Sequence, residues 1–341
     1  MIPPELRPHV VTAAHAGALD AETTCRDLDE IFAQLDARAR SGAIRHVLLY
    51  AHGGLVTRSA ALDAMRGIVK SMGDDVHVIG FVWHSGLLET LVDRIEDKLR
   101  GHDLMDAQVG PIQGAQQRFL DPEVEKAARV VAAPLWNEMK RNAQDAWKPR
   151  HAGDEVLVRL ADFAARHPDV GIHVAGHSAG SIYLGPFVKR WIEEKRSLRT
   201  CSLWAPACTT AFFRETYGPA LAGGVGAFRL YTLTDDAETS DTCDRVYAKS
   251  LLYLVSRALE EGTQPVPLLG MQTSYPDVED LLAGHARILA PQPGPWAPSN
   301  AARHGDFDND PATLVSTAEA IHGKRLPVIE AEQPLTRRAE R

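Results

Sequence analysis

The segment GIHVAGHSAGSIYLGPF places a serine between two glycines, where an apolar stretch gives way to a helical pattern. Gly176-His177-Ser178-Ala179-Gly180 fits the G-x-S-x-G nucleophile elbow, in which the serine backbone is strained and neighbouring segments pass close by. A helix that begins at the serine also turns its amide N–H groups toward developing negative charge. The pattern predicts a nucleophilic serine, and the alternative is a tight turn with a capping serine.

A second glycine corner follows an earlier apolar stretch, in YAHGGL at residues 50–55. Acyl transfer needs preorganised amides around the oxyanion, each worth about a hundredfold to a thousandfold in rate. We expect Gly53, Gly54 and Ala179 to supply these donors. The alternative is a glycine turn in which His52 packs against the sheet edge.

A nucleophilic serine needs a base, and histidine serves near neutral pH. We expect the base late in the chain, at His304 in RHGDFDND, where the next residue is a glycine that leaves room for the ring. His285 and His322 are alternatives within or beside helical patterns. His177 lies too near the serine, on the wrong side of the elbow, to act as base.

The acidic residues after His304 have the 1-3-5 spacing of a calcium loop, at Asp306, Asp308 and Asp310. An EF-hand loop needs glycine at position 6 and glutamate at position 12. Here those positions hold Pro311 and Thr317. The sequence therefore does not predict a calcium site.

A carboxylate must orient the histidine, and it is expected between the serine and the histidine in chain order. The segment FRLYTLTDDAETSD offers Asp235, Asp236, Glu238 and Asp241 just after an apolar stretch. We favour Asp236, with Asp235 as the alternative acid. Glu238 and Asp241 are expected to cap or pair locally.

Apolar segments alternate with helical patterns along most of the chain. We expect strands at 9–15, 44–54, 76–83, 171–175, 201–207 and 227–233, with a last one at either 267–271 or 286–290, and helices at 25–40, 61–72, 153–166, 181–195 and 246–261. Several of the strands are apolar on both faces, which is typical of a parallel sheet covered by helices on both sides. The pattern predicts an α/β fold.

Residues 86–148 interrupt this alternation with helical patterns, and we expect a helical lid over the carboxyl edge of the sheet. Trp83, with His84, Ser85 and Gly86 after it, is expected to line the pocket, together with His52 and His177. We predict one domain over residues 1–322 and a disordered tail over 323–341.

The composition is that of a globular protein, with 341 residues and a formal net charge of −8. The sequence has no Lys/Arg-rich block of the kind that binds nucleic acid. It has no apolar stretch long enough for a membrane span, and the N-terminus lacks a signal-peptide pattern. The scattered cysteines Cys25, Cys201, Cys208 and Cys243 are expected to be reduced thiols, without a zinc site. We predict a cytoplasmic protein with no metal and no cofactor.

Ser178, Asp236 and His304 in that order, with the HGG corner after an early strand, resemble the α/β-hydrolase superfamily, in particular its esterase and lipase branch with a helical lid. The resemblance covers roughly residues 44–320. It implies a doubly wound, mostly parallel sheet and a two-step acyl-enzyme mechanism. Leu55 stands where HGGG-type esterases carry a third glycine, so the resemblance leaves the oxyanion donors open.

The leading hypothesis is a serine esterase that acts on a small-molecule acyl ester. An acyltransferase or amidase with the same triad is an alternative that the sequence does not separate from it. A non-catalytic hydrolase-like binding protein is a third, and the presence of serine, aspartate and histidine argues against it. The natural acyl chain and the oligomeric state are not predicted.

Overall fold

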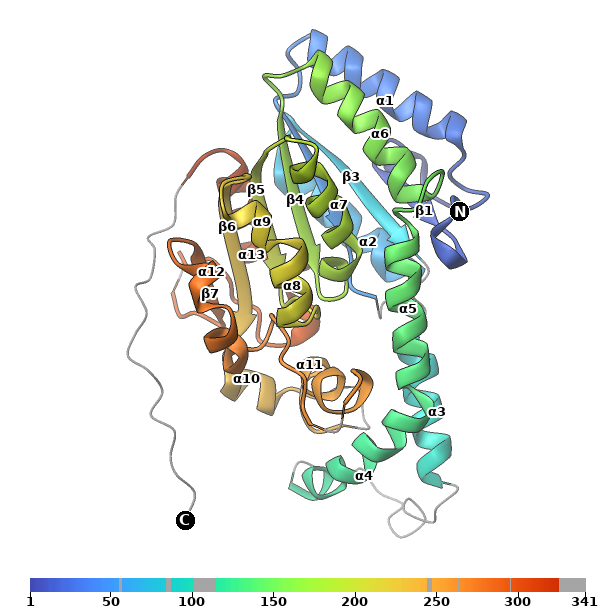
Figure 1. Cartoon of the computed structure of the whole chain (residues 1–341), viewed down its shortest axis with the longest axis vertical. Coiled ribbons are helices and arrows are strands. Elements are labelled where there is room, and N and C mark those ends of the chain that lie inside the picture. The colour runs from blue at the N-terminus through green and yellow to red at the C-terminus, as the bar shows by residue number, and fades with distance from the viewer. Residues whose placement is uncertain are drawn as a thin grey trace.

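Seven parallel strands form the centre of the protein (Figure 1). The computed structural model describes residues 1–54, 57–83, 87–100, 115–243, 247–262, 264–294 and 296–324. The strands are β1 Val10–Ala13, β2 His46–Ala51, β3 Val76–Trp83, β4 Gly171–His177, β5 Leu198–Trp204, β6 Val225–Leu233 and β7 Ala286–Ala290, in the spatial order β1-β3-β2-β4-β5-β6-β7. Every neighbouring pair is parallel, which confirms the α/β class. The last strand is the one at 286–290.

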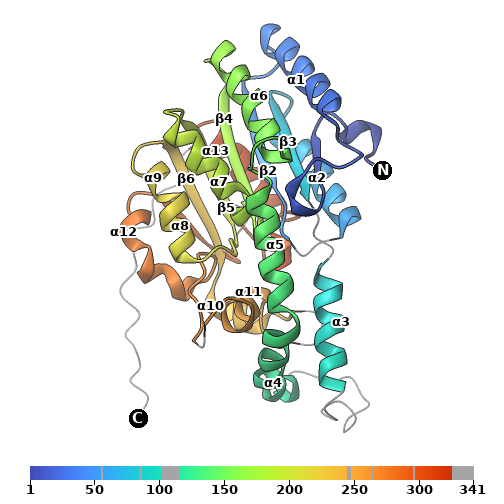
Figure 2. The same cartoon turned by 45° about the vertical axis from the view of Figure 1, so that its right-hand side comes forward.

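Helices cover both faces of the sheet, so the central strands are buried along their whole length. One face carries α1 Cys25–Arg40, α6 Ala152–Arg166, α7 Gly180–Glu193, α8 Thr210–Thr216 and α9 Gly218–Leu221. The other carries α2 Arg58–Met72 and α13 Pro311–Ile321, which pack on each other (Figures 1 and 2). No helix among the described residues is long and apolar enough to cross a membrane.

The connections of the sheet change direction between β2 and β4. After β2 the chain crosses one face through α2 to β3, whereas after β4 it crosses the opposite face through α7 to β5. The two strands are direct neighbours, with Ala51 in register with Gly176. Ligands of open α/β sheets bind where connections diverge in this way, at the carboxyl ends of the strands. Both glycine corners lie at this point.

Three helices occupy the interruption between β3 and α6: α3 Leu87–Arg100, α4 Ala115–Val131 and α5 Ala133–Asp145. They extend beyond the carboxyl edge of the sheet, and α5 returns along α7 (Figures 1 and 2). Trp136 of α5 donates a hydrogen bond of 2.6 Å to Glu260, and Lys140 lies 2.7 Å from the same carboxylate. The insertion is therefore tied to the connection between β6 and β7.

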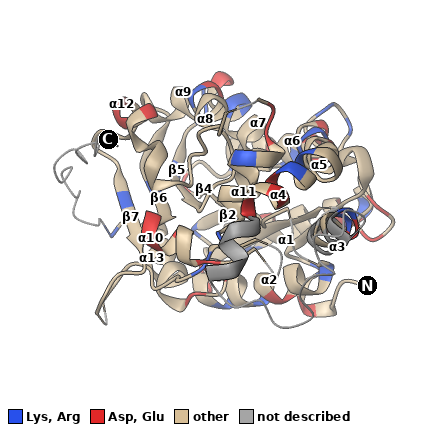
Figure 3. Ribbon diagram, turned by 90° about the horizontal axis from the view of Figure 1, so that it is seen from below, with Lys and Arg blue, Asp and Glu red and all other residues tan. Residues whose placement is uncertain are grey.

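That connection differs from the long helix expected at 246–261. The structure has a short helix, α11 Leu251–Leu254, followed by a π-helical turn at Val255–Leu259. Ser250 caps α11 by accepting from the amide of Tyr253, and the amide of Ala248 donates to the carboxylate of Asp121 in α4. These side-chain acceptors hold residues 248–250 outside the helix. Seen from below, α4 and α11 lie in front of the central strands, and acidic and basic residues are mixed along the ribbon (Figure 3).

The close approach of α7 to β2 gives a stability prediction. A Cβ on Gly180 would overlap the carbonyl oxygen of Ala51, whereas a Cβ on Gly67 in α2 would meet no atom within 4 Å. Gly180→Ala should lower the free energy of unfolding by about 1–3 kcal/mol or more through overpacking. Gly67→Ala should raise it by about 0.5–1 kcal/mol, because alanine favours a helix interior. Urea denaturation measures both, and equal midpoints would contradict this packing.

Candidate active site

Ser178 occupies a sharp turn between β4 and α7. Its φ is 50°, in the left-handed region that a residue with a side chain adopts only under constraint. The constraint is visible on both sides: the Ser178 amide donates to Trp204 at 2.9 Å, and its carbonyl accepts from the amide of Ala207 at 3.0 Å. The hydroxyl of Ser181 also donates to the Ser178 carbonyl, at 2.6 Å. The turn is therefore held by β5 and by the first residues of α7.

The hydroxyl of Ser178 meets the ring of His304. The Oγ to Nε2 distance is 2.9 Å, and His304 lies in the turn His304–Asp306 after β7. Burial lowers the pKa of His304 to about 3, and the nearby charge of His177 acts in the same direction. The imidazole is consequently neutral at physiological pH and can accept a proton from the hydroxyl.

Amide donors surround this serine. The backbone N–H groups of Gly53, Gly54 and Ala179 have no hydrogen-bond acceptor among the described residues. A Cβ on Gly53 would lie 3.2 Å from the Cβ of Ser178, so the backbone of this corner passes directly beside the serine. Such unpartnered amides can bind an oxyanion. Leu55 lies outside the described residues.

His52 fixes the glycine corner. Its Nε2 accepts from the Trp83 amide at 3.3 Å, so its Nδ1 carries the proton and donates to the Gly53 carbonyl at 2.5 Å. Burial lowers the pKa of His52 to about 4, which keeps the ring neutral. Because the Gly53 carbonyl and the Gly54 amide share one planar peptide, His52 also orients the Gly54 N–H.

His177 contacts the backbone of His304. Its Nε2 donates to the His304 carbonyl at 2.9 Å, and its Nδ1 lies 3.3 Å from the Asp308 carboxylate. All three residues are buried. Burial opposes the charged form of His177, yet Asp308 and the His304 carbonyl raise its pKa overall. Asp308 thus pairs with His177 beneath the turn that carries His304.

The four candidate acids have different surroundings. Asp236 is exposed, and Asp235 accepts a hydrogen bond of 2.6 Å from the hydroxyl of Tyr253. Among the described residues, neither carboxylate forms a hydrogen bond with His304. The buried Asp241 accepts from the backbone N–H of His304 at 2.9 Å. The ring Nδ1 of His304 has no partner among the described residues. The position of Asp236 therefore does not support the role predicted for it, and Asp241 is the carboxylate that touches His304.

Glu238, the remaining candidate, is nearly inaccessible to solvent, and its carboxylate accepts from the Ser250 hydroxyl. Burial raises the pKa of Glu238 to about 8. The side chain is therefore mostly uncharged at neutral pH. An uncharged carboxyl group stabilises an imidazolium poorly, so Glu238 is a weak candidate for orienting His304.

The acidic residues after His304 have separate structural roles. Asp306 accepts from the amides of Ala302 and Arg303, and Asp310 caps α13. Asp308, which pairs with His177, has a function that sequence reasoning missed. The signal for it in the sequence is its spacing of four residues from His304.

The site is closed in this structure: Ser178 is 4% exposed and His304 is 6% exposed. Met139 of α5 occupies the space beside Gly54, and Trp83 closes the same side. Residues 84–86, predicted to line the pocket, lie outside the described residues. The insertion thus reaches the glycine corner through α5.

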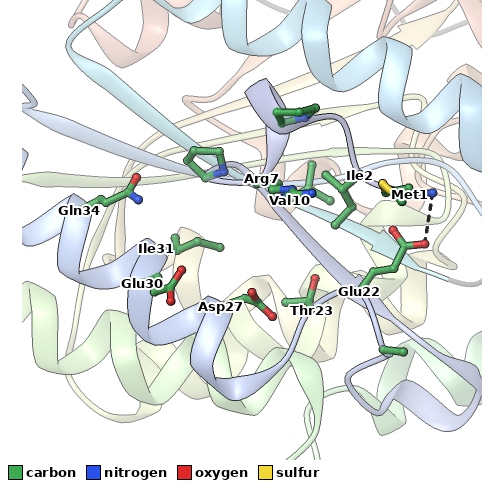
Figure 4. Close-up of a pocket in the computed structure, with 13 residues that line it drawn as sticks. Met1, Ile2, Arg7, Val10, Glu22, Thr23, Asp27, Glu30, Ile31 and Gln34 are labelled. Carbon is green, nitrogen blue, oxygen red and sulfur yellow. Dashed lines mark ion pairs between the residues drawn. The ribbon is translucent and has the colours of Figure 1, made fainter.

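Two cavities of the described structure lie elsewhere. One of about 550 Å³ lies between the N-terminal segment and α1, where the amino group of Met1 pairs with Glu22 (Figure 4). The other, of about 820 Å³, opens at the amino ends of the strands and is lined in part by His285 and His322. Both alternative bases are therefore at the edge opposite Ser178.

Comparisons of the chain with protein-family models, with curated proteins and with solved structures found no match. Only the fold and the geometry of this site therefore bear on the function.

The buried pair of His177 and Asp308 gives a pH-dependent prediction. The pKa of Asp308 lies below its usual 3.8 because His177 offsets the cost of burial, and that of His177 lies above its usual 6.5. The pair should therefore stabilise the fold fully between these usual values. This contribution is lost as pH rises through the raised pKa of His177, and as pH falls through the lowered pKa of Asp308.

Asp308→Asn should therefore be most destabilising at mildly acidic pH, by up to about 3–5 kcal/mol. Denaturant unfolding of both proteins across pH measures the difference. Asp236→Asn, at an exposed carboxylate, is the control and should change little at any pH. A constant difference between wild type and Asp308→Asn would contradict the ion pair.

Proposed function

We propose that this chain is a serine hydrolase of the α/β-hydrolase type that cleaves carboxylic esters through an acyl-enzyme intermediate. The observation that carries the proposal is the 2.9 Å contact between Ser178 Oγ and His304 Nε2 on a left-handed elbow. A nucleophile and a neutral base within hydrogen-bond reach form the core of nucleophilic catalysis. A turn needed only for packing would not require a buried histidine on the serine hydroxyl.

In the first step, Ser178 attacks the ester carbonyl while His304 Nε2 takes the hydroxyl proton. The amides of Gly53, Gly54 and Ala179 bind the oxyanion of the tetrahedral intermediate. His304 then donates its proton to the leaving alcohol, and the serine is acylated. In the second step His304 takes a proton from a water molecule that attacks the acyl-enzyme. His304 then returns this proton to Ser178 Oγ as the bond to the serine breaks and the acid is released.

We assign the orienting carboxylate to Asp241 in place of Asp236 or Asp235. Its Oδ2 accepts from the His304 backbone amide, and the His304 ring Nδ1 that an orienting acid would bind has no partner among the described residues. A carboxylate there fixes the tautomer with the proton on Nδ1 and stabilises the imidazolium that forms. The chain order of serine, acid and histidine is preserved.

The helices α3, α4 and α5 are proposed to act as the lid. Met139 beside Gly54 brings α5 against the proposed oxyanion corner. The contacts of Trp136 and Lys140 with the carboxylate of Glu260 hold α5 against the connection between β6 and β7. Closure over the serine limits access of water, and opening would admit the substrate.

Ser178→Ala tests the proposed function. Hydrolysis of an activated acetyl ester should fall by several orders of magnitude, because no other group can form the acyl-enzyme. The loss of one oxygen should leave the circular dichroism spectrum and the unfolding midpoint close to those of the wild type. More than a few per cent of residual turnover would exclude Ser178 as the nucleophile.

A pair of variants tests the orienting acid. Asp241→Asn should reduce kcat by up to about ten-thousandfold, because the histidine then adopts the wrong tautomer. Asp236→Asn removes a charge from the same segment at an exposed position and should leave kcat within a few-fold of the wild type. The reverse order of effects would return the role to Asp236.

A further inference from the structure

The amino edge of the sheet, opposite Ser178, gathers metal-ligating side chains from distant parts of the chain. His46 is the first residue of β2, Asp75 lies in the turn before β3, and His322 follows α13. One ligand atom from each lies within 4.8 Å of the other two. Three such groups from three segments converge beside the cavity of about 820 Å³.

Both ring nitrogens of His322 have partners. Its Nδ1 donates to the Ala318 carbonyl at 2.7 Å, because a carbonyl can only accept. Its Nε2 lies 3.0 Å from the carboxylate of Asp75. A histidine that binds a metal usually donates its other N–H to a carbonyl or carboxylate in this way, which fixes the tautomer of the ring.

His46 has a corresponding support. Its Nδ1 lies 3.0 Å from Nε2 of the buried His173, whose Nδ1 lies 2.8 Å from the hydroxyl of Thr200. In the tautomers in which His46 Nδ1 donates to His173 and His173 Nδ1 donates to Thr200, His46 Nε2 has a lone pair available for a metal ion.

We propose that His46, Asp75 and His322 form a binding site for one divalent transition-metal ion of the zinc class. Two imidazoles and one carboxylate are ligands that zinc accepts, with a fourth position left open. Calcium and magnesium prefer sites made of oxygen atoms only. A simple ion pair between Asp75 and His322 would account for those two residues, but not for the approach of His46 to the same point while its Nδ1 contacts His173.

Positive charges line the same cavity. Arg45, Arg199 and Lys324 are among its lining residues. They oppose a bare cation, and they favour an anion as the fourth ligand of the metal. The site therefore suits a metal ion whose open position is taken by hydroxide or by a small carboxylate or phosphate.

The proposed metal site does not depend on the proposed esterase activity. The two sites lie at opposite ends of β2, roughly 17 Å apart along a six-residue strand. A metal here would join the end of α13 to the starts of β2 and β3. Since α13 directly follows the loop of His304 and Asp308, this joint would anchor the segment that carries the base.

The experiment uses tag-free, full-length protein freed of metal by dialysis against a chelator. Isothermal titration with Zn²⁺ should show one ion bound per chain, and bound Zn²⁺ should raise the unfolding temperature. Co²⁺ should bind with the visible absorption of a low-symmetry site. Mg²⁺ should bind far more weakly than Zn²⁺.

Asp75→Asn and His322→Gln should each weaken Zn²⁺ binding by about 10- to 100-fold or more. Both positions are partly exposed, so circular dichroism should show an intact fold. His285→Gln is the matched control, because His285 lines the same cavity outside the cluster. Absence of stoichiometric Zn²⁺ binding, equal affinities for Zn²⁺ and Mg²⁺, unchanged binding by both cluster variants, or equal loss in His285→Gln would overturn the proposal.

Discussion

The left-handed backbone of Ser178 is the constraint on which the candidate site depends. A residue with a side chain pays a conformational cost at φ 50°, and here hydrogen bonds to Trp204 and Ala207 hold it there. The turn lifts the hydroxyl out of the sheet toward His304. It also brings α7 so close to β2 that only glycine fits at position 180. The turn therefore brings the Ser178 hydroxyl to the ring of His304 and beside the corner at Gly53.

A second layer of polar groups lies beneath that turn. His52 holds the Gly53–Gly54 peptide, whereas His177 pairs with Asp308 and holds the backbone of His304. His52 directly follows β2 and His177 ends the neighbouring β4, yet their pKa values shift in opposite directions. Burial lowers the pKa of both rings, and the close carboxylate of Asp308 outweighs it at His177.

Much of the fold could be predicted from the sequence, because buried parallel strands and amphipathic helices leave clear patterns. Ser178, the glycine corner and His304 come from motifs whose chemistry fixes their order along the chain. The carboxylate could not be predicted in the same way. Four acidic residues follow β6 within seven positions, and the burial that separates Asp241 from Asp236 arises from long-range packing against the loop of His304.

Two further features of the structure could not be predicted from the sequence, for similar reasons. Residues 248–250 have helical spacing, but contacts with Asp121 in the distant α4 keep them out of a helix. His46, Asp75 and His322 share no local spacing, because they meet only when the amino ends of β2 and β3 reach the end of α13. Clusters built from single residues of distant segments leave no motif in a single sequence.

Covalent labelling with a fluorophosphonate tests most directly whether His304 activates Ser178. Peptide mass spectrometry should find a single adduct on Ser178 in the wild-type protein, and the rate of labelling should fall by about a hundredfold or more in His304→Ala. An adduct on another serine, no adduct, or labelling of Ser178 at an unchanged rate without His304 would contradict this activation.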